Sequence, residues 1–270
     1  MRGKRHLVKS LGCRLNAAEA LRWEKELVKL GWTKGSNKTD EVDLVIINSC
    51  SVTHKADKET RQLIRRMRRE NPKAYITVTG CWVGYEKVRD EALKMDKRVD
   101  SWVVNKDKDR LVNNLKLKKG DRVIRERLGY KGKRFIKVQD GCNHRCYYCV
   151  TALRRGLSRS RKIEEIVKEV KEAEKEGVER AIFTGVDLAD FKPSLVELIK
   201  KAIKETKKIK IGMGSLGLKG VSDELIEVFN QNRKRMVGYL HIPIQSGCDQ
   251  TLKRMNRRYK VKEFDKLVES

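Results

Sequence analysis

Apolar residues recur in two alternating patterns along the first part of the chain. Short apolar runs predict strands at residues 6–11, 42–47, 74–79 and 99–104. Between these runs, apolar positions return at helical spacing and predict helices at residues 16–30, 57–71, 85–95 and 107–115. Strands that alternate with helices form parallel sheets covered by those helices. This part is therefore predicted to be an α/β domain with a Rossmann-like parallel sheet.

The second part of the chain repeats the alternation. Its predicted strands are residues 135–138, 180–184, 209–213 and 239–244, and its predicted helices are residues 163–177, 194–207, 223–230 and 262–270. This βα repetition predicts a partial (β/α) barrel. A charged, glycine-containing stretch lies between the two parts and is interpreted as a linker. The predicted division is a first domain at 1–118, a linker at 119–133 and a barrel at 134–270.

Composition adds information about the setting of the protein. Of the 270 residues, 39% are hydrophobic and 37% are charged. No apolar run approaches the roughly 18 residues that a membrane span needs, and the basic start lacks the apolar core of a signal peptide. We therefore expect a cytoplasmic protein with no membrane partner.

The charge balance points to a polyanionic partner. Lys and Arg number 64 against 37 Asp and Glu, which gives a net charge of +27. Such an excess attracts nucleic acid through its long-range positive field. The alternative is the lysine-rich surface of a heat-stable protein. That alternative explains abundant Lys and Glu but not the large excess of basic residues.

Three of the seven cysteines form one tight C-x3-C-x2-C run, Cys142, Cys146 and Cys149. Three thiolates can hold a [4Fe–4S] cluster and leave one iron open, the iron that reductive cleavage of S-adenosylmethionine needs. The alternative is a structural zinc loop that takes a fourth ligand from elsewhere, such as His144 or His241.

Three further cysteines each follow a predicted strand of the first domain: Cys13, Cys50 and Cys81. The carboxyl ends of parallel strands lie at one edge of a sheet, so these side chains can converge there. Converging thiolates again suit a cluster with one open iron. The alternative is three unrelated buried cysteines. The seventh cysteine, Cys248, is interpreted as an incidental thiol.

Taken together, the chain resembles the radical S-adenosylmethionine methylthiotransferases over essentially all of its 270 residues. The motifs that carry the resemblance are Leu11-Gly12-Cys13-Arg14-Leu15-Asn16, Val45-Ile46-Ile47-Asn48-Ser49-Cys50-Ser51-Val52-Thr53, Val78-Thr79-Gly80-Cys81, Lys137-Val138-Gln139-Asp140-Gly141-Cys142-Asn143, Arg155-Gly156, Phe183-Thr184-Gly185-Val186-Asp187 and His241-Ile242-Pro243-Ile244-Gln245-Ser246-Gly247.

The resemblance implies two [4Fe–4S] clusters and S-adenosylmethionine. The cluster on Cys142, Cys146 and Cys149 would generate a 5′-deoxyadenosyl radical, and the cluster on the other trio would carry or supply sulfur. The resemblance also implies that seven further residues contact S-adenosylmethionine, and for each of them the alternative is a role in packing only. These residues are Tyr148, Arg155, Gly185, Val186, Asp187, Gln245 and Ser246.

Within the family, the stretch from Cys50 to Arg66 is similar to the branch that modifies threonylcarbamoyladenosine in tRNA. The resemblance therefore implies a 2-methylthio modification of that nucleoside at position 37, in the anticodon stem-loop. Other branches act on isopentenyladenosine in tRNA or on an aspartate of a ribosomal protein. A non-catalytic RNA-binding relative is a further alternative. The implied protein is a monomer that takes electrons from a donor such as flavodoxin or ferredoxin.

The charge of one predicted helix supports an RNA substrate independently. Its arginines are expected to bind phosphates, and the alternative is a solvated helix face. These residues are Arg61, Arg65, Arg66, Arg68 and Arg69.

Three departures from the family pattern stand out. Family chains are longer and end in a small RNA-binding β-barrel, so we expect a truncated barrel with an exposed edge. Cys248 stands where the family usually has Ser, and Ala152 and Leu153 replace a proline-containing stretch.

Overall fold

The computed structural model describes residues 3–35, 41–83, 96–115, 117 and 132–269. The chain divides into two compact units. The N-terminal unit comprises Met1–Gly129 and the short segment Leu153–Arg155, and the C-terminal unit comprises Tyr130–Ala152 and Gly156–Ser270. The predicted helix at 85–95 and residues 119–131 of the predicted linker lie outside the described residues.

The N-terminal unit is built on a five-stranded sheet in the order β2-β1-β3-β4-β5, in which every neighbouring pair is parallel. The central strand β3 is buried along its whole length, as its apolar run predicts. The strands are β1 (Arg5–Ser10), β2 (Thr33–Lys34), β3 (Leu44–Ser49), β4 (Tyr75–Gly80) and β5 (Ser101–Val103). The α/β class and the parallel sheet are thus confirmed.

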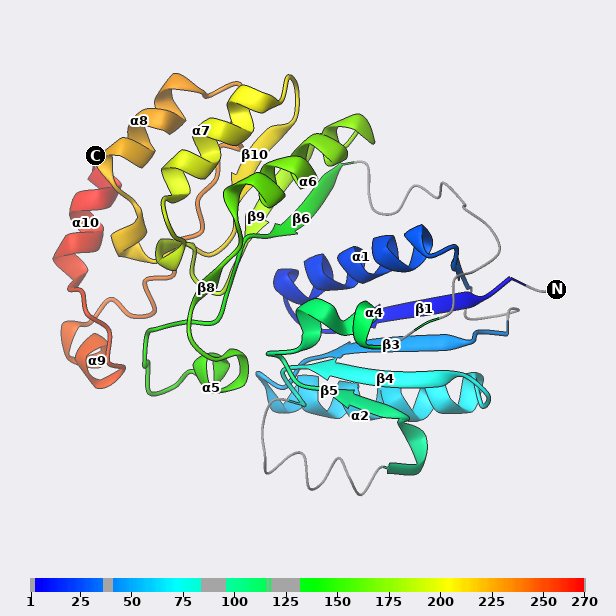
Figure 1. Ribbon diagram of the computed structural model, residues 1–270. Coiled ribbons are helices and arrows are strands. Elements are labelled where there is room, and N and C mark those ends of the chain that lie inside the picture. The colour runs from blue at the N-terminus through cyan, green and yellow to red at the C-terminus, as the bar shows by residue number, and fades with distance from the viewer. Residues whose placement is uncertain (1–2, 36–40, 84–95, 116, 118–131, 270) are drawn as a thin grey trace. The chain divides into compact units, whose positions relative to one another are not determined.

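Helices cover both faces of this sheet (Figure 1). On one face, Trp23 and Leu27 of α1 pack with Leu44 and Ile46 of β3. On the other face, α2 packs against the residues of β3 and β4 that alternate with these. The helical elements are α1 (Arg14–Lys29), α2 (His54–Glu70), η1 (Asp96–Arg98), η2 (Lys108–Arg110) and α4 (Leu111–Asn114).

The C-terminal unit contains a parallel sheet in the order β10-β9-β6, with α6, α7 and α8 packed against it (Figure 1). The two-residue strands β7 and β8 pair antiparallel, β7 before the cysteine loop and β8 after it. Its strands are β6 (Lys133–Lys137), β7 (Gln139–Asp140), β8 (Arg159–Ser160), β9 (Arg180–Thr184) and β10 (Lys210–Met213). Its helical elements are α6 (Ile163–Lys175), η3 (Leu188–Asp190), α7 (Leu195–Glu205), η4 (Leu218–Gly220), α8 (Asp223–Gln231), α9 (Asp249–Arg254) and α10 (Val261–Glu269), and α5 (Thr151–Arg155) ends in the N-terminal unit.

The strand predicted at residues 239–244 is wrong. Instead of a regular strand, the chain makes single parallel bridges, from Met236 to Ile211 and from His241 to Ser215. Pro243 has no backbone N–H to donate to a ladder, and the carbonyl oxygens of Pro243 and Ile244 both accept from the Tyr259 hydroxyl. The segment therefore follows β10 without forming a fourth strand.

The other differences from the sequence predictions are smaller. The helix predicted at 107–115 is a 3-10 turn followed by the short helix α4, and the short elements β2, β7, β8, α5 and α9 were not predicted. Among the described residues, no helix is both long enough and apolar enough to span a membrane.

Candidate metal centres

The first cysteine trio lies at the carboxyl edge of the N-terminal sheet. In the register of the sheet, Ser10 pairs with Asn48 and Ser49 pairs with Gly80, so β1, β3 and β4 end side by side. Cys13 precedes α1, Cys50 follows β3 and Cys81 follows β4. Burial raises the pKa of Cys81, while the charges of Arg155 and Lys108 lower it and those of Cys13 and Cys50 raise it. The three thiols are therefore electrostatic neighbours, as the strand-end argument predicts.

Two glycines make this convergence possible. Gly12 has a φ of +85°, and a Cβ added to it would lie 2.5 Å from Cys50 Sγ. Gly80 has a φ of +99°, and a Cβ there would overlap the Ser49 carbonyl oxygen. Only glycine accepts such angles without strain. The space beside Cys50 Sγ is thus kept open by the missing side chain of Gly12.

A buried polar network supports the loops of this trio. Asn16 Nδ2 donates to the carbonyl oxygens of Leu11 (2.7 Å) and Ser49 (3.0 Å), which joins the loops after β1 and β3. Asn48 Nδ2 donates to Glu19 Oε2 at 3.0 Å. Lys108 Nζ lies 2.7 Å from the same oxygen, and both side chains are fully buried. Glu19 and Lys108 were not among the predicted site residues, because a charged residue in an amphipathic helix is normally expected to face solvent.

Arg155 belongs to the N-terminal unit and is buried there. Its guanidinium lies 3.3 Å from Glu19 Oε1 and donates to Asn16 Oδ1 at 2.5 Å. The expected contact between Arg155 and the carboxylate of S-adenosylmethionine stays a prediction. In the structure, the guanidinium joins the polar network beside the first trio.

The second trio, Cys142, Cys146 and Cys149, lies on the loop between β7 and α5. Gly141, with a φ of +73°, starts this loop where a Cβ would overlap the Leu157 carbonyl group. The Cys142 N–H donates to the Gly156 carbonyl oxygen at 3.0 Å, and the Cys149 N–H donates to that of Cys146 at 3.0 Å. All three cysteines are half-buried. The loop is thus folded back on itself, with its cysteines partly exposed.

Burial raises the pKa of Cys142 to about 11. The backbone N–H of His144, 3.3 Å from Cys142 Sγ, opposes this shift, whereas the charges of Asp190, Asp187 and Cys149 add to it. A metal that binds here therefore has to displace the thiol proton, as thiolate ligation generally requires.

Two aspartates after β9 anchor the cysteine loop. His144 Nε2 lies 3.2 Å from Asp187 Oδ2, and this hydrogen bond raises the pKa of His144. The backbone N–H of Asn143 donates to Asp190 Oδ2 at 3.3 Å. Among the described residues, Cys142, His144 and Asp190 form a group whose ligand atoms lie within 4.8 Å of one another. His144 thus lies beside Cys142, but this group includes neither Cys146 nor Cys149, which the zinc alternative also needs, and the His144 imidazole is hydrogen-bonded to Asp187.

Gln139 fixes the loop expected to contact S-adenosylmethionine. Its Oε1 accepts from the backbone N–H groups of Val186 (2.8 Å) and Asp187 (3.2 Å), and its Nε2 donates to the Gly141 carbonyl oxygen at 2.7 Å. A Cβ on Gly185 would lie 2.6 Å from that Oε1. Gln139 therefore ties the β9 exit to the cysteine loop, a role that the sequence did not reveal.

The remaining predicted cofactor contacts lie in the same unit. The Tyr148 hydroxyl accepts from Arg257 Nη2 at 2.5 Å, and the ring is 47% exposed. Gln245 has a φ of +71°, and Ser246 Oγ accepts from the Cys248 N–H at 3.2 Å. Their contacts to a cofactor stay predictions.

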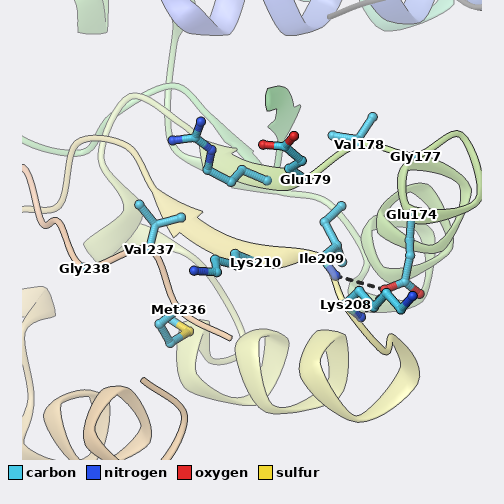
Figure 2. Close-up of a pocket in the computed structure, with 11 residues that line it drawn as sticks. Glu174, Gly177, Val178, Glu179, Lys208, Ile209, Lys210, Met236, Val237 and Gly238 are labelled. Atoms are coloured by element: carbon cyan, nitrogen blue, oxygen red, sulfur yellow. Dashed lines mark hydrogen bonds between the residues drawn. The ribbon is translucent and has the colours of Figure 1, made fainter. Parts of the chain in front are cut away.

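A cavity of about 630 Å³ in the C-terminal unit lies at the amino ends of β9 and β10 (Figure 2). It is lined by Val178, Arg180, Lys208 and Met236 among others, and the Glu174 carboxylate at its wall accepts from the Ile209 N–H at 3.0 Å. In parallel barrels the active site lies at the carboxyl ends of the strands. This cavity is at the opposite end from the cysteine loop and is not the candidate site.

Two family models match the chain. The Radical SAM superfamily matches residues 136–270, and the uncharacterized protein family UPF0004 matches residues 5–104. A solved structure of TsrM, a radical S-adenosylmethionine methyltransferase from Kitasatospora setae with cobalamin and a [4Fe-4S] cluster bound, is similar with a TM-score of 0.61 at 12% identity. The similarity covers 99% of this chain and 67% of that one, and it concerns the fold.

Several curated relatives of the chain are tRNA-modifying enzymes by name. The threonylcarbamoyladenosine tRNA methylthiotransferase MtaB of Thermotoga maritima is 31% identical over 97% of this chain and 63% of its own length. That of Chlamydia pneumoniae is 33% identical over 96% and 62%. The tRNA-2-methylthio-N(6)-dimethylallyladenosine synthase of Thermodesulfovibrio yellowstonii is 28% identical over 98% and 64%. The chain thus spans somewhat less than two thirds of the length of these relatives.

Proposed function

The chain belongs to the methylthiotransferases of the radical SAM superfamily, and from this premise we propose that it converts N6-threonylcarbamoyladenosine at position 37 of tRNA to its 2-methylthio derivative. The names of the MtaB relatives, the similarity of the Cys50–Arg66 stretch to that branch and the net charge of +27 support this substrate. Its electron donor, flavodoxin or ferredoxin, and its monomeric state stay predictions.

The family implies S-adenosylmethionine and a [4Fe–4S] cluster, and we assign this cluster to Cys142, Cys146 and Cys149. Three soft thiolate donors on one accessible loop fit such a cluster. When bound together, the cluster and S-adenosylmethionine supply the radical that removes hydrogen from an inert C–H bond. The chain's part is to hold the loop in place, which Gln139 and Asp187 do through the bonds described above.

We assign a second cluster to Cys13, Cys50 and Cys81. The fit rests on the donor set and on the open space beside Cys50 Sγ that Gly12 provides. Asn16, Asn48 and Glu19 hold the loops of this trio. Sulfur insertion needs a sulfur source in addition to a radical generator, and two centres on separate units supply one each.

The observation that carries this proposal is the presence of two cysteine trios, one at the carboxyl ends of three parallel strands and the other on the single loop between β7 and α5. Anaerobically prepared protein should contain about eight irons per chain. Reconstituted protein with S-adenosylmethionine, dithionite and tRNA should form 5′-deoxyadenosine and the 2-methylthio nucleoside, as measured by mass spectrometry. A Cys13→Ala variant should keep the first product and lose the second.

The same assay separates the alternatives. Methylthiolation of dimethylallyladenosine instead would assign the substrate of the Thermodesulfovibrio relative. A modified ribosomal-protein aspartate with an unchanged nucleoside profile would remove tRNA as the substrate. Zinc in place of iron, held by the second cysteine trio with His144 or His241 as the fourth ligand, would remove the radical chemistry.

A further inference from the structure

The basic residues of α2 fall into two groups in the structure. Arg61 pairs with Asp57 at 3.0 Å, and Arg66 pairs with Glu70 at 2.8 Å. Arg68 pairs with Asp100 at 2.5 Å and donates to the carbonyl oxygens of Pro72, Ala74 and Arg98, so it fastens the end of the helix. The second group consists of exposed residues that form no ion pair with the residues that the structure describes: Lys55, Lys58, Arg65 and Arg69.

This second group forms one stripe. The spacings from Lys55 to Lys58, Arg65 and Arg69 each return the side chain to the same face of a helix. At 1.5 Å per residue, the stripe is about 21 Å long. Gln62, the other exposed residue on this line, is uncharged. We call Lys55, Lys58, Arg65 and Arg69 the α2 ridge.

Helix stability does not explain the α2 ridge. Lys55 and Lys58 lie near the N-terminus of α2, where the helix dipole disfavours positive charge. Like charges three or four residues apart, as in Lys55–Lys58 and Arg65–Arg69, also repel. The exposed acids of α2 are Glu59 and Glu70, and the helix as a whole carries more basic than acidic residues.

The solvated helices α6 and α7 differ from α2 in their charge pattern. Some of their lysines pair with acids of neighbouring helices, for example Lys201 with Glu164 at 2.8 Å and Lys171 with Glu205 at 3.0 Å. The first turn of α6 carries Glu164 and Glu165, as the dipole favours. Other exposed lysines of these helices form no ion pair with the described residues either, so the α2 ridge is distinguished by its four aligned cations and by their extension to the helix N-terminus, which an anionic partner explains.

The composition of the α2 ridge favours nucleic acid over protein as this partner. Protein interfaces have apolar or aromatic centres, whereas the stripe is made only of Lys, Arg and Gln62. Nucleic-acid interfaces are polar and strongly positive.

The ridge also leads toward the first cysteine trio. Thr60 on α2 donates to the Cys50 carbonyl oxygen at 2.9 Å, and Lys55 lies five positions after Cys50. We propose that the α2 ridge binds the phosphate backbone of the RNA substrate and directs the strand toward Cys50. This inference rests on the proposed function, because it takes RNA as the substrate.

The test compares two variants of the reconstituted protein with equal charge loss. The ridge variant is Lys55→Gln, Lys58→Gln, Arg65→Gln and Arg69→Gln. The control is Lys168→Gln, Lys175→Gln, Lys204→Gln and Lys234→Gln, all exposed residues of the C-terminal unit. Gln has a helix propensity close to that of Lys and Arg, so both variants should fold, as circular dichroism will check. Binding of transcribed tRNA is measured between about 50 and 200 mM salt, the range over which phosphate contacts change affinity strongly.

The ridge variant should bind at least about tenfold more weakly, and the slope of log K against log salt should fall by roughly three, because each lost phosphate contact removes about 0.7 to 0.9. The control variant should keep most of the wild-type affinity and most of the wild-type salt slope. A variant with Arg65→Lys and Arg69→Lys in place of the Gln substitutions keeps the positive charge, so its slope of log K against log salt should match that of the wild type.

Two results would overturn the proposal. One is an unchanged salt slope in the ridge variant, and the other is an equal loss of tRNA affinity in the control variant. Binding is measured without catalysis, so the two proposals can fail separately. If tRNA binding depends on the α2 ridge but no 2-methylthio nucleoside is formed, the result counts against the proposed function and not against the ridge.

Discussion

The buried imidazole of His6 makes the stability of the N-terminal unit sensitive to acid. His6 on β1 is fully buried, and neither ring nitrogen has a hydrogen-bond partner among the described residues. Burial, followed by the charge of Lys34, lowers the pKa of His6 from 6.5 to about 4. Because the charged ring is disfavoured only in the folded state, the unfolded chain binds more protons between these pH values.

The sign and size of the effect follow from this difference. The stability contributed by neutral His6 is fully present above pH 6.5 and is lost as the pH falls toward 4. At about 1.4 kcal/mol per pKa unit, roughly 2 kcal/mol is lost between pH 6.5 and pH 5, and about 3 kcal/mol by pH 4.

The measurement is urea unfolding followed by tryptophan fluorescence at pH 7.5 and pH 5. All four tryptophans of the chain, Trp23, Trp32, Trp82 and Trp102, lie in the N-terminal unit, so the signal reports on the unit that holds His6. A His6→Leu variant should lose its share of the acid sensitivity and should be at least as stable at pH 7.5, because it removes two unpaired buried polar atoms.

Exposed His54 provides the matched control as His54→Gln, which should retain the wild-type dependence on pH. Comparing each variant with the wild type at the same pH cancels other acid effects, including those on the metal centres. If His6→Leu and the wild type lose equal free energy between pH 7.5 and pH 5, the buried ring does not control this dependence and the reasoning is wrong.

Three other changes test the supports of the two centres. Gly12→Ala places a Cβ against Cys50 Sγ at a φ of +85° and should remove about four irons per chain, measured by metal analysis, with a loss of only about 1–2 kcal/mol in stability; full iron content would refute it. Lys108→Met takes a buried charge away from Glu19 and should destabilise the N-terminal unit by roughly 3–5 kcal/mol in the tryptophan assay, and a change below 1 kcal/mol would contradict this. Gln139→Leu leaves the Val186 and Asp187 N–H groups without their acceptor, so their amide exchange should accelerate by at least about tenfold, whereas unchanged exchange would show that the loop holds itself.

The sequence predicted the parts of the fold that burial determines. β3 and β9 are apolar runs between helices of clear periodicity, so local pattern and tertiary packing agree. It did not predict β2, β7 or β8, each two residues long, because such pairs depend on hydrogen bonds to distant segments. The strand expected at 239–244 failed for a related reason, since an apolar run containing Pro243 has no complete ladder to join.

The cysteines of the candidate sites were visible in the sequence, but their supports were not. Glu19 lies between Ala18 and Ala20 on α1, and the sequence gives no sign that this charged residue is buried, as it is in the structure. Its burial becomes understandable only when Lys108, far along the chain, is brought to it. Similarly, the two bonds from Gln139 to the β9 exit require the parallel pairing of β6 with β9. Polar networks between distant elements are therefore the part that sequence pattern cannot supply.

The two trios depend on the fold in different ways, and this difference makes them separable by experiment. Cys13, Cys50 and Cys81 meet only if β1, β3 and β4 keep their register, so a change in that sheet affects this trio. Cys142, Cys146 and Cys149 share one loop, so their spacing is largely local and depends on anchors such as Gln139. Gly12→Ala should consequently abolish sulfur insertion and keep 5′-deoxyadenosine formation, whereas a Gln139 substitution that disturbs the second trio should lower both products, because insertion needs the radical. Loss of 5′-deoxyadenosine from Gly12→Ala would mean that the centres are coupled beyond what their supports imply.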